Sequence, residues 1–247
     1  TKIIPWFDHN RIRNVIWTGG EPTLHPLLGR MLSKVHAAGF TNTIITNGIE
    51  LENLFDGIGQ DVNAFILSLD ATNSNDYQSI RGVNCFKKLI TLPERIRNKF
   101  PNIQVSICML LQRLNIDKIE EFIVMAIGIG VRNVSFLVPD LYGYLDPGSR
   151  AYSFGRKNIM NSIYLNKIVP TIDQLNCFSE RIPRILEKFG DNSKVNSPTL
   201  HFLTYYHDYF KAFLEKKMPR SNPRCYFPEH YFVLSVDGMV KPCFFIS

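Results

Sequence analysis

Residues 15–22 read Val-Ile-Trp-Thr-Gly-Gly-Glu-Pro, and this stretch decides the fold class of the chain. An apolar run predicts a short strand, and two glycines then let the backbone approach a ligand closely. Glu21 offers a carboxylate to a cationic amine, and Pro22 stiffens the exit from the turn. In α/β barrels, polar residues that end strands lie on the rim where ligands bind. This turn is therefore the first candidate for a functional site.

The same succession of apolar strand, polar turn and amphipathic segment repeats from residue 14 to about residue 139. Each strand candidate is nearly continuous in hydrophobicity, as expected for strands covered on both faces. The pattern predicts an α/β fold with parallel strands, and the helical run 86–100 should kink or restart at Pro93. Strands are expected at residues 14–18, 43–46, 64–69, 103–111 and 133–138.

Two more of these strands end in polar residues. Thr46-Asn47-Gly48 closes the second strand and Ser68-Leu69-Asp70 closes the third. Because parallel strands end on the same rim, these groups could converge on one small molecule. Taken singly, each is also ordinary turn chemistry, since Asn-Gly is a common turn and Ser or Asp often caps a helix.

Together, in this order and spacing, the three motifs resemble the radical S-adenosylmethionine superfamily. The resemblance covers about residues 14–139 and includes Leu24-His25-Pro26 after the first motif. It implies a partial (βα)6 TIM-like barrel of which this chain supplies strands two to six. It also implies a cofactor site with Gly19, Gly20, Glu21 and Pro22 at the methionyl amine, Thr46 and Asn47 near the carboxylate, and Ser68 and Asp70 near the carboxylate or ribose.

The family holds its catalytic 4Fe-4S cluster in a Cys-x3-Cys-x2-Cys loop, and residues 1–247 contain no such loop. Three thiolates leave one iron open for the amino and carboxylate groups of the cofactor. Because the chain begins at Thr1 rather than at a methionine, we expect a fragment whose cluster loop lies upstream. The alternative is a degenerate barrel that binds S-adenosylmethionine without catalysis and acts as a binding module.

Cys225 and Cys243 bracket a predicted hairpin with a two-residue turn at Asp237-Gly238. This segment resembles the opening of a SPASM or twitch domain, which implies that both cysteines are ligands of an auxiliary iron–sulfur cluster. The alternative is a hairpin whose two cysteines are unrelated thiols that bind no cluster. The expected domains are a core barrel at 1–139, a bridging helical region at 140–224 and the start of the auxiliary domain, a small β-hairpin module, at 225–247.

The resemblance implies an enzyme that, when complete, reductively cleaves S-adenosylmethionine to a 5'-deoxyadenosyl radical, which abstracts hydrogen from a substrate. The SPASM-like tail implies a peptide or protein substrate, and the chemistry implies an electron donor such as flavodoxin or ferredoxin. The formal charge of +6 is scattered along the chain, which favours a solvated surface over a nucleic-acid interface. Without a signal peptide or a long apolar run, we expect a cytoplasmic protein that does not enter a membrane.

Overall fold

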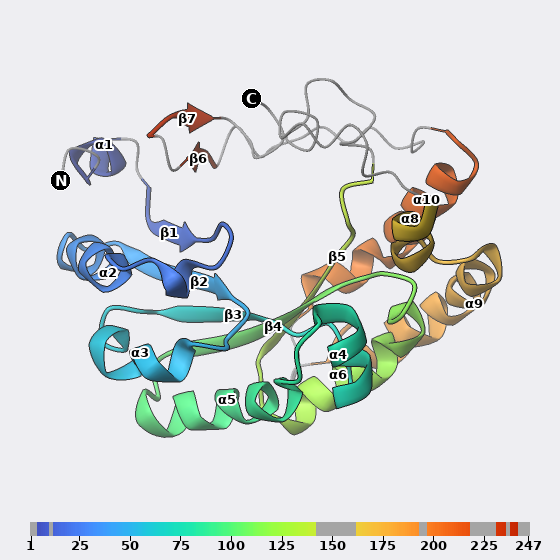
Figure 1. Ribbon diagram of the computed structural model, residues 1–247, viewed down its shortest axis with the longest axis horizontal. Coiled ribbons are helices and arrows are strands. Elements are labelled where there is room, and N and C mark those ends of the chain that lie inside the picture. The colour runs from blue at the N-terminus through green and yellow to red at the C-terminus, as the bar shows by residue number, and fades with distance from the viewer. Residues whose placement is uncertain are drawn as a thin grey trace. The chain divides into compact units, whose positions relative to one another are not determined.

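The computed structural model describes residues 4–9, 12–141, 162–192, 197–217, 231–235 and 238–241 (Figure 1). Cys225 and Cys243 lie outside the described residues, so the predicted auxiliary ligands stay predictions. The chain divides into two compact units. The first contains Thr1–Leu111, Asp117–Leu137 and Pro183–His201, and the second contains Gln112–Ile116, Val138–Ile182 and Phe202–Ser247.

The first unit contains one sheet of five parallel strands in the order β1-β2-β3-β4-β5. All five predicted strands are present, and the α/β fold class is confirmed. Their ends differ from the predicted ends by no more than two residues. The strands are β1 Asn14–Trp17, β2 Thr41–Thr46, β3 Ala64–Ser68, β4 Gln104–Leu110 and β5 Asn133–Leu137.

Helical segments join consecutive strands, as a parallel sheet requires. Those of the first unit are α1 Ile4–His9, η1 Pro22–Leu24, α2 Leu28–Ala37, α3 Leu51–Ile58, α4 Ser74–Arg81, α5 Phe86–Lys99 and α6 Ile119–Gly128. The remaining segments are η2 Ile116–Lys118, α8 Ser162–Ile168, α9 Ile172–Phe189, η3 Pro198–Phe202 and α10 Leu203–Leu214.

Helix α5 runs through Pro93 as one element, so the helix does not restart at this proline. A proline inside a helix removes one backbone hydrogen bond and crowds the preceding turn. Pro93 is buried together with Leu92 and Ile96 on the face that packs into the core. Burial of that apolar face offsets the missing bond.

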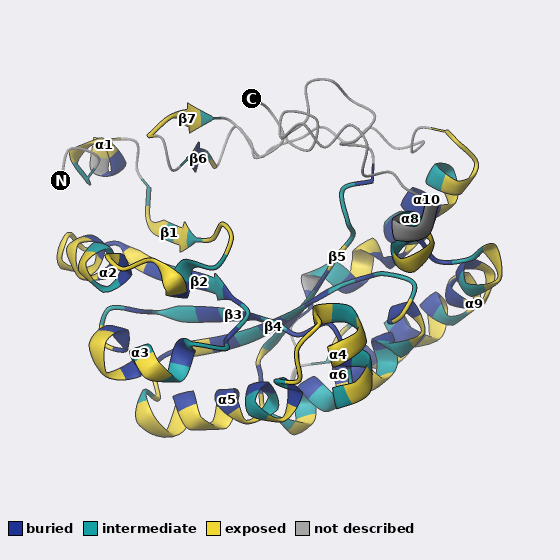
Figure 2. Ribbon diagram, in the orientation of Figure 1, coloured by how far each residue is buried: buried dark blue, intermediate teal, exposed yellow. Residues whose placement is uncertain are grey.

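Burial alternates along the strands, and the helices cover one face of the sheet (Figure 2). Ile44, Phe65 and Ile107 point to this covered face and have no solvent exposure. The opposite face, called the open face below, is less buried, and Ile16 and Leu137 are 44% and 53% exposed there. In the described residues the strands are therefore not covered equally on both faces, because the open face is the concave side of a partial barrel.

A buried asparagine joins three elements beneath β1 and β2. The side chain of Asn42 has no solvent exposure and makes three hydrogen bonds. Its Oδ1 accepts from Trp17 Nε1 at 2.8 Å, and its Nδ2 donates to the carbonyls of Leu32 at 3.0 Å and Asp61 at 2.7 Å. Asn42 thus connects β1, α2 and the segment that leads into β3.

The second unit contains the hairpin formed by β6 Val233–Leu234 and β7 Val240–Lys241. Leu234 pairs with Val240, and Ser235 N donates to Met239 O at 3.0 Å. Val236 and Asp237 lie outside the described residues, so the two-residue turn at Asp237-Gly238 stays a prediction. Gly238 has a φ of +83°, a left-handed backbone conformation that favours glycine.

Among the described helices, none has both the length and the apolar content needed to cross a lipid bilayer.

Candidate functional site

The carboxylate of Glu21 connects the turns that follow β1 and β2. Its Oε1 accepts hydrogen bonds from Thr23 N at 3.1 Å, Thr23 Oγ1 at 2.6 Å and Thr46 Oγ1 at 2.6 Å. Its Oε2 accepts from Asn47 N at 2.8 Å. Pro22 begins η1 directly after Glu21 and so fixes the direction of the chain. The structure thus brings three of the predicted site residues, Glu21, Thr46 and Asn47, into direct contact.

These four bonds show that Glu21 fixes the positions of the two turns. Three of the bonds go to Oε1 and one to Oε2, so within the described residues Oε2 keeps a lone pair for a further donor. The predicted contact of Glu21 with a cationic amine therefore stays a prediction, and the backbone carbonyls of the rim are further potential acceptors. The sequence identified Glu21 as a site residue but not the donors that bond to its carboxylate.

The backbone of the glycine turn is accessible. Gly19 and Gly20 are exposed, and apart from the adjacent residues no described atom lies within 4 Å of the place where a Cβ would stand on either residue. Gly19 has a φ of +142°, a conformation that residues with side chains rarely adopt. The turn thus presents main-chain atoms with free space beside them, as close approach of a ligand requires.

The motif after β2 is built differently. The hydroxyl of Thr46 is committed to Glu21, and it also accepts from Gly48 N at 3.0 Å, so this buried residue has a bracing role. Asn47 is half-buried, and its Oδ1 accepts from Ile49 N at 2.9 Å. Within the described residues the Nδ2 group of Asn47 makes no hydrogen bond, so two donors remain for a ligand.

Ser68 and Asp70 follow on the next strand. Ser68 lies on the open face, and its hydroxyl makes no hydrogen bond to the described part of the chain. Asp70 is 3% exposed and both carboxylate oxygens are used: Oδ1 accepts from Leu110 N at 2.8 Å, and Oδ2 lies 2.6 Å from Arg81 Nη2. Burial raises the pKa of the Asp70 carboxyl, while Arg81 and the Leu110 amide oppose that rise. Ser68 and Asp70 make no direct contact with Glu21 that the structure records.

Sequence reasoning missed a row of small polar side chains across the open face. Cys108 pairs with Ser68 on β3 and with Ser135 on β5. Three consecutive strands therefore carry a hydroxyl or thiol at the same height near their carboxyl ends. The signal was present in β4, because Ser106 and Cys108 alternate with the buried apolar residues Val105, Ile107 and Met109.

Burial raises the pKa of the Cys108 thiol to about 11, so this group is almost entirely protonated at neutral pH. Only thiolates react rapidly with iodoacetamide. At pH 8 we expect Cys108 to be alkylated at least about a hundredfold more slowly than the exposed Cys177, with a rate that rises about tenfold per pH unit toward pH 11. Mass spectrometry of the separate cysteine peptides measures both rates, and equal rates at pH 8 would contradict the assignment.

No group of three His, Cys, Asp or Glu side chains that could hold a metal ion occurs within the described residues. Cys85, Cys108 and Cys177 are all free thiols. The described residues therefore do not supply the three thiolates that an iron–sulfur cluster needs. No catalytic step that depends on such a cluster can be derived from them.

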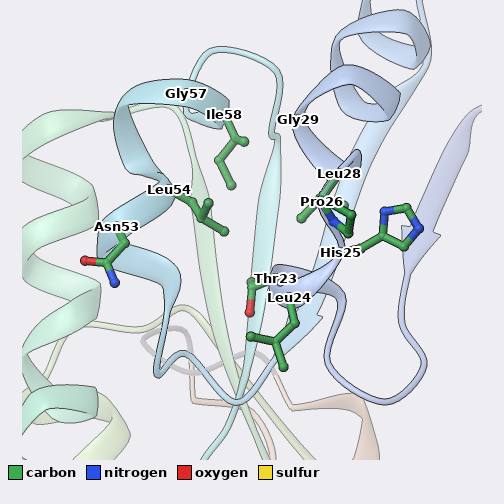
Figure 3. A pocket seen from close by; sticks show the side chains of 10 residues that line it. All are labelled: Thr23, Leu24, His25, Pro26, Leu28, Gly29, Asn53, Leu54, Gly57 and Ile58. Carbon is green, nitrogen blue, oxygen red and sulfur yellow. The ribbon is translucent and has the colours of Figure 1, made fainter.

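A cavity of about 340 Å³ lies between the start of α2 and helix α3 (Figure 3). Leu24, Pro26 and Leu28 line one side, and Leu54 and Ile58 line the other. The remaining lining residues are Thr23, His25, Gly29, Asn53 and Gly57. The cavity shares Thr23 with the Glu21 bonds but contains none of the predicted cofactor-binding residues. It is therefore a separate feature of the helical layer.

The fold and the glycine turn agree with a known protein family. The model of the Radical SAM superfamily matches residues 2–126, about half of the chain. The chain belongs to the radical SAM superfamily. The matched segment ends inside α6 and includes the turns after β1, β2 and β3, so the rim described above lies within the matched residues.

The curated and solved relatives that this radical SAM chain matches are larger proteins. It is 27% identical over 127 residues to the GTP 3',8-cyclase of Chlorobaculum tepidum, which is 50% of this chain and 38% of that protein. Streptococcus suis SuiB bound to S-adenosylmethionine matches with a TM-score of 0.65 and 17% identity over 98% of this chain and 52% of its own. The chain thus spans about half, or less, of the length of these relatives.

Further solved structures share the fold. SuiB bound to its precursor peptide SuiA matches with a TM-score of 0.61 and 16% identity, covering 98% of this chain and 51% of its own. The structure of anSMEcpe with bound AdoMet and the Kp18Cys peptide matches with a TM-score of 0.57 and 17% identity, covering 93% of this chain and 60% of its own. At these identities the match shows the fold alone, and it confirms a partial barrel of the radical SAM type.

Proposed function

We propose that the rim formed by the turns after β1, β2 and β3 binds S-adenosylmethionine in a radical SAM enzyme of which this chain is a part. One observation carries the proposal. Glu21 holds the turns after β1 and β2 together and leaves the glycine backbone and the side-chain amide of Asn47 available to a ligand. A purely structural turn has no need of two exposed glycines, one of which adopts a conformation that residues with side chains rarely reach.

The available groups suit a small zwitterion. The carbonyls of Gly19 and Gly20 and the remaining lone pair of Glu21 Oε2 are acceptors for a methionyl amine. The amide of Asn47 and the hydroxyl of Ser68 are donors for the methionyl carboxylate or the ribose. Thr46 and Asp70 then support the site from behind, through Glu21 and Leu110. In this arrangement some residues contact the cofactor, whereas Thr46 and Asp70 hold those residues in place.

For the complete protein, we propose reductive cleavage of the cofactor to a 5'-deoxyadenosyl radical and hydrogen abstraction from a peptide or protein. The iron–sulfur cluster of this family supplies the electron for that cleavage. Structures of two proteins with the same fold contain bound peptides, which supports the substrate class. Cys225 and Cys243 as auxiliary-cluster ligands, a flavodoxin or ferredoxin donor, and a cytoplasmic location remain parts of this proposal.

The test uses the complete gene product that carries this chain, reconstituted anaerobically with iron and sulfide and reduced with dithionite. We expect S-adenosylmethionine to be converted to 5'-deoxyadenosine, measured by liquid chromatography, and we expect the release to need Gly19 and Gly20. The variant Gly20→Val should lower product formation at least about tenfold, because a branched side chain fills the space beside the turn.

Two results would change the conclusion. If the protein binds the cofactor but releases no 5'-deoxyadenosine with any reductant, a non-catalytic binding module becomes the better description. If Gly20→Val binds the cofactor as tightly as the unaltered protein does, the cofactor site lies elsewhere.

A further inference from the structure

Asn47 and Gly48 form an Asn-Gly pair in the turn after β2, and no other Asn-Gly pair occurs in residues 1–247. In such a pair the backbone nitrogen of the glycine can attack the side-chain amide carbon of the asparagine, because glycine has no Cβ to hinder the approach. The proposed function uses the amide of Asn47 but does not involve this reaction. The hydrogen bonds around the pair determine how fast the reaction proceeds.

The fold requires glycine at position 48. Gly48 has a φ of +74°, a left-handed conformation that residues with side chains rarely adopt. A Cβ on this residue would lie 2.7 Å from Cδ2 of Leu89 and 3.1 Å from Cδ1 of Leu92, and both leucines are buried. Replacement of the glycine therefore costs stability, and the packing keeps the reactive pair together.

The side chain of Asn47 is prepared for the attack. Its Oδ1 accepts a hydrogen bond from Ile49 N at 2.9 Å. This bond polarises the amide carbonyl and stabilises the negative charge that Oδ1 acquires when a nucleophile adds to Cγ, as the donors of an oxyanion hole do. The Nδ2 group, which leaves, makes no hydrogen bond within the described residues. Both features favour addition at Cγ and departure of the amine.

The attacking nitrogen, in contrast, is restrained. Gly48 N donates to Thr46 Oγ1 at 3.0 Å, and the Thr46 hydroxyl donates to Glu21 Oε1 at 2.6 Å. Because the proton of that hydroxyl is committed to the carboxylate, its oxygen is held as an acceptor for Gly48 N. The nitrogen must lose its proton and turn toward Cγ before it attacks, and either change breaks the bond to Thr46. Glu21 thus acts on the pair through a buried threonine.

We propose that Asn47-Gly48 is a site of spontaneous deamidation, which the Glu21–Thr46 bonds restrain and which inactivates the cofactor site when it proceeds. Gly48 N loses its proton to water and forms a bond to Asn47 Cγ. The Cγ–Nδ2 bond then breaks, and Nδ2 takes a proton back from water and leaves as ammonia. A second water opens the resulting succinimide at either carbonyl and yields aspartate or isoaspartate. No electron is transferred, and water is the only co-reactant.

Either product changes a turn that the proposed function assigns to the cofactor, and this part of the inference rests on that function. An aspartate replaces the two Nδ2 donors by a negative charge, which repels a carboxylate. An isoaspartate also inserts a methylene group into the backbone and displaces Gly48 from its tight position beside Leu89. A bound cofactor holds the amide of Asn47, so the empty form of the protein is the one that is inactivated.

The first experiment incubates the full chain at pH 8 and follows deamidation of the Asn47 peptide by mass spectrometry. The folded chain should react at least about tenfold more slowly than the same chain in urea, because the bonds to Thr46 must open first. Thr46→Val removes the hydroxyl and should abolish most of this protection, whereas Thr46→Ser keeps it. Thr43→Val is the matched control on the same strand, since its hydroxyl bonds to Asn14 Oδ1, and the rate should stay unchanged.

Two outcomes would overturn the restraint: equal rates in the folded and the urea-unfolded chain, or equal rates in Thr46→Val and the unaltered chain. Asn73-Ser74, at the start of α4, is the internal reference in the same digest. If Thr46→Val unfolds, this second pair also reacts faster, and Thr46→Ser then decides. The hydroxyl restraint predicts the unaltered rate for Thr46→Ser, and a rate equal to that in urea contradicts it.

The second experiment titrates S-adenosylhomocysteine into the full chain. Asn47→Asp should weaken binding at least about tenfold, and more than Asn47→Ala, which removes the donors without adding a charge. At ten times its Kd the probe should slow deamidation about tenfold, because only the empty chain reacts. If Asn47→Asp binds as tightly as the unaltered chain, deamidation does not inactivate the site and that part is overturned. If the unaltered chain binds no probe, the proposed cofactor site fails, while the rates of the first experiment still test the restraint.

Discussion

Replacing Asn42 by alanine should lower the free energy of unfolding by about 3 to 4 kcal/mol, because three hydrogen bonds are lost and their partners stay buried. The partners are Trp17 Nε1, the Leu32 carbonyl and the Asp61 carbonyl. Each belongs to a different element, so β1 and α2 lose their shared anchor to β2. Urea unfolding followed by circular dichroism measures the change.

Asn14→Ala is the matched control for this substitution. Asn14 is also an asparagine of the same sheet, but it is exposed, and its Oδ1 accepts only from the hydroxyls of Thr41 and Thr43. We expect a loss below about 1 kcal/mol there, since water replaces the lost bonds. If Asn42→Ala costs no more than Asn14→Ala, the buried hydrogen bonds contribute nothing to folding and the assignment is wrong.

Replacing Glu21 by alanine should have the largest effect on cofactor binding, on the order of a hundredfold for S-adenosylhomocysteine. The substitution releases four donors at once, two on Thr23, one on Thr46 and one on the Asn47 amide. The turns after β1 and β2 are then no longer fixed against each other, so the ligand must order them on binding. Stability should fall by about 2 to 3 kcal/mol as well.

Two variants separate positioning from stability. Glu50→Ala removes a carboxylate near the same strand end, but this one bonds only to the Asn53 side chain, and neither binding nor stability should change appreciably. Glu21→Gln keeps one oxygen acceptor and places an amide N–H against the Asn47 amide, so it should lose most of the affinity although its shape is nearly unchanged. Retention of full affinity by Glu21→Gln would mean that the carboxylate does not position the turns.

The strands were predictable because their apolar runs are long enough to identify without tertiary information. Val-Ile-Trp before Gly19 and the run ending at Ser68 are examples, and both turned out to be strands of the parallel sheet. Pro93 does not restart the helix, because burial of one face of α5 outweighs the local preference against a proline. Local rules fail where tertiary packing is stronger.

The candidate site was predictable only as a set of positions. Glu21, Thr46 and Asn47 share a rim because parallel strands end together, which is a matter of topology. That Glu21 bonds to Thr23 and to the second turn depends on atomic positions fixed to within a few tenths of an ångström, which no sequence pattern carries. Asn42 did leave a signal, since an asparagine at a core-facing position of an apolar strand must find buried partners.

Asp70 also determines how β3 and β4 are aligned along their length. Its carboxylate takes the place of a backbone carbonyl in bonding to the Leu110 amide, and the same group holds Arg81. If β3 slipped by one residue, the carboxylate would lose both partners, and every side chain of the strand would turn to the opposite face. Only one alignment of β3 and β4 keeps both partners of Asp70, so it also fixes the position of Ser68 along the strand to a single residue.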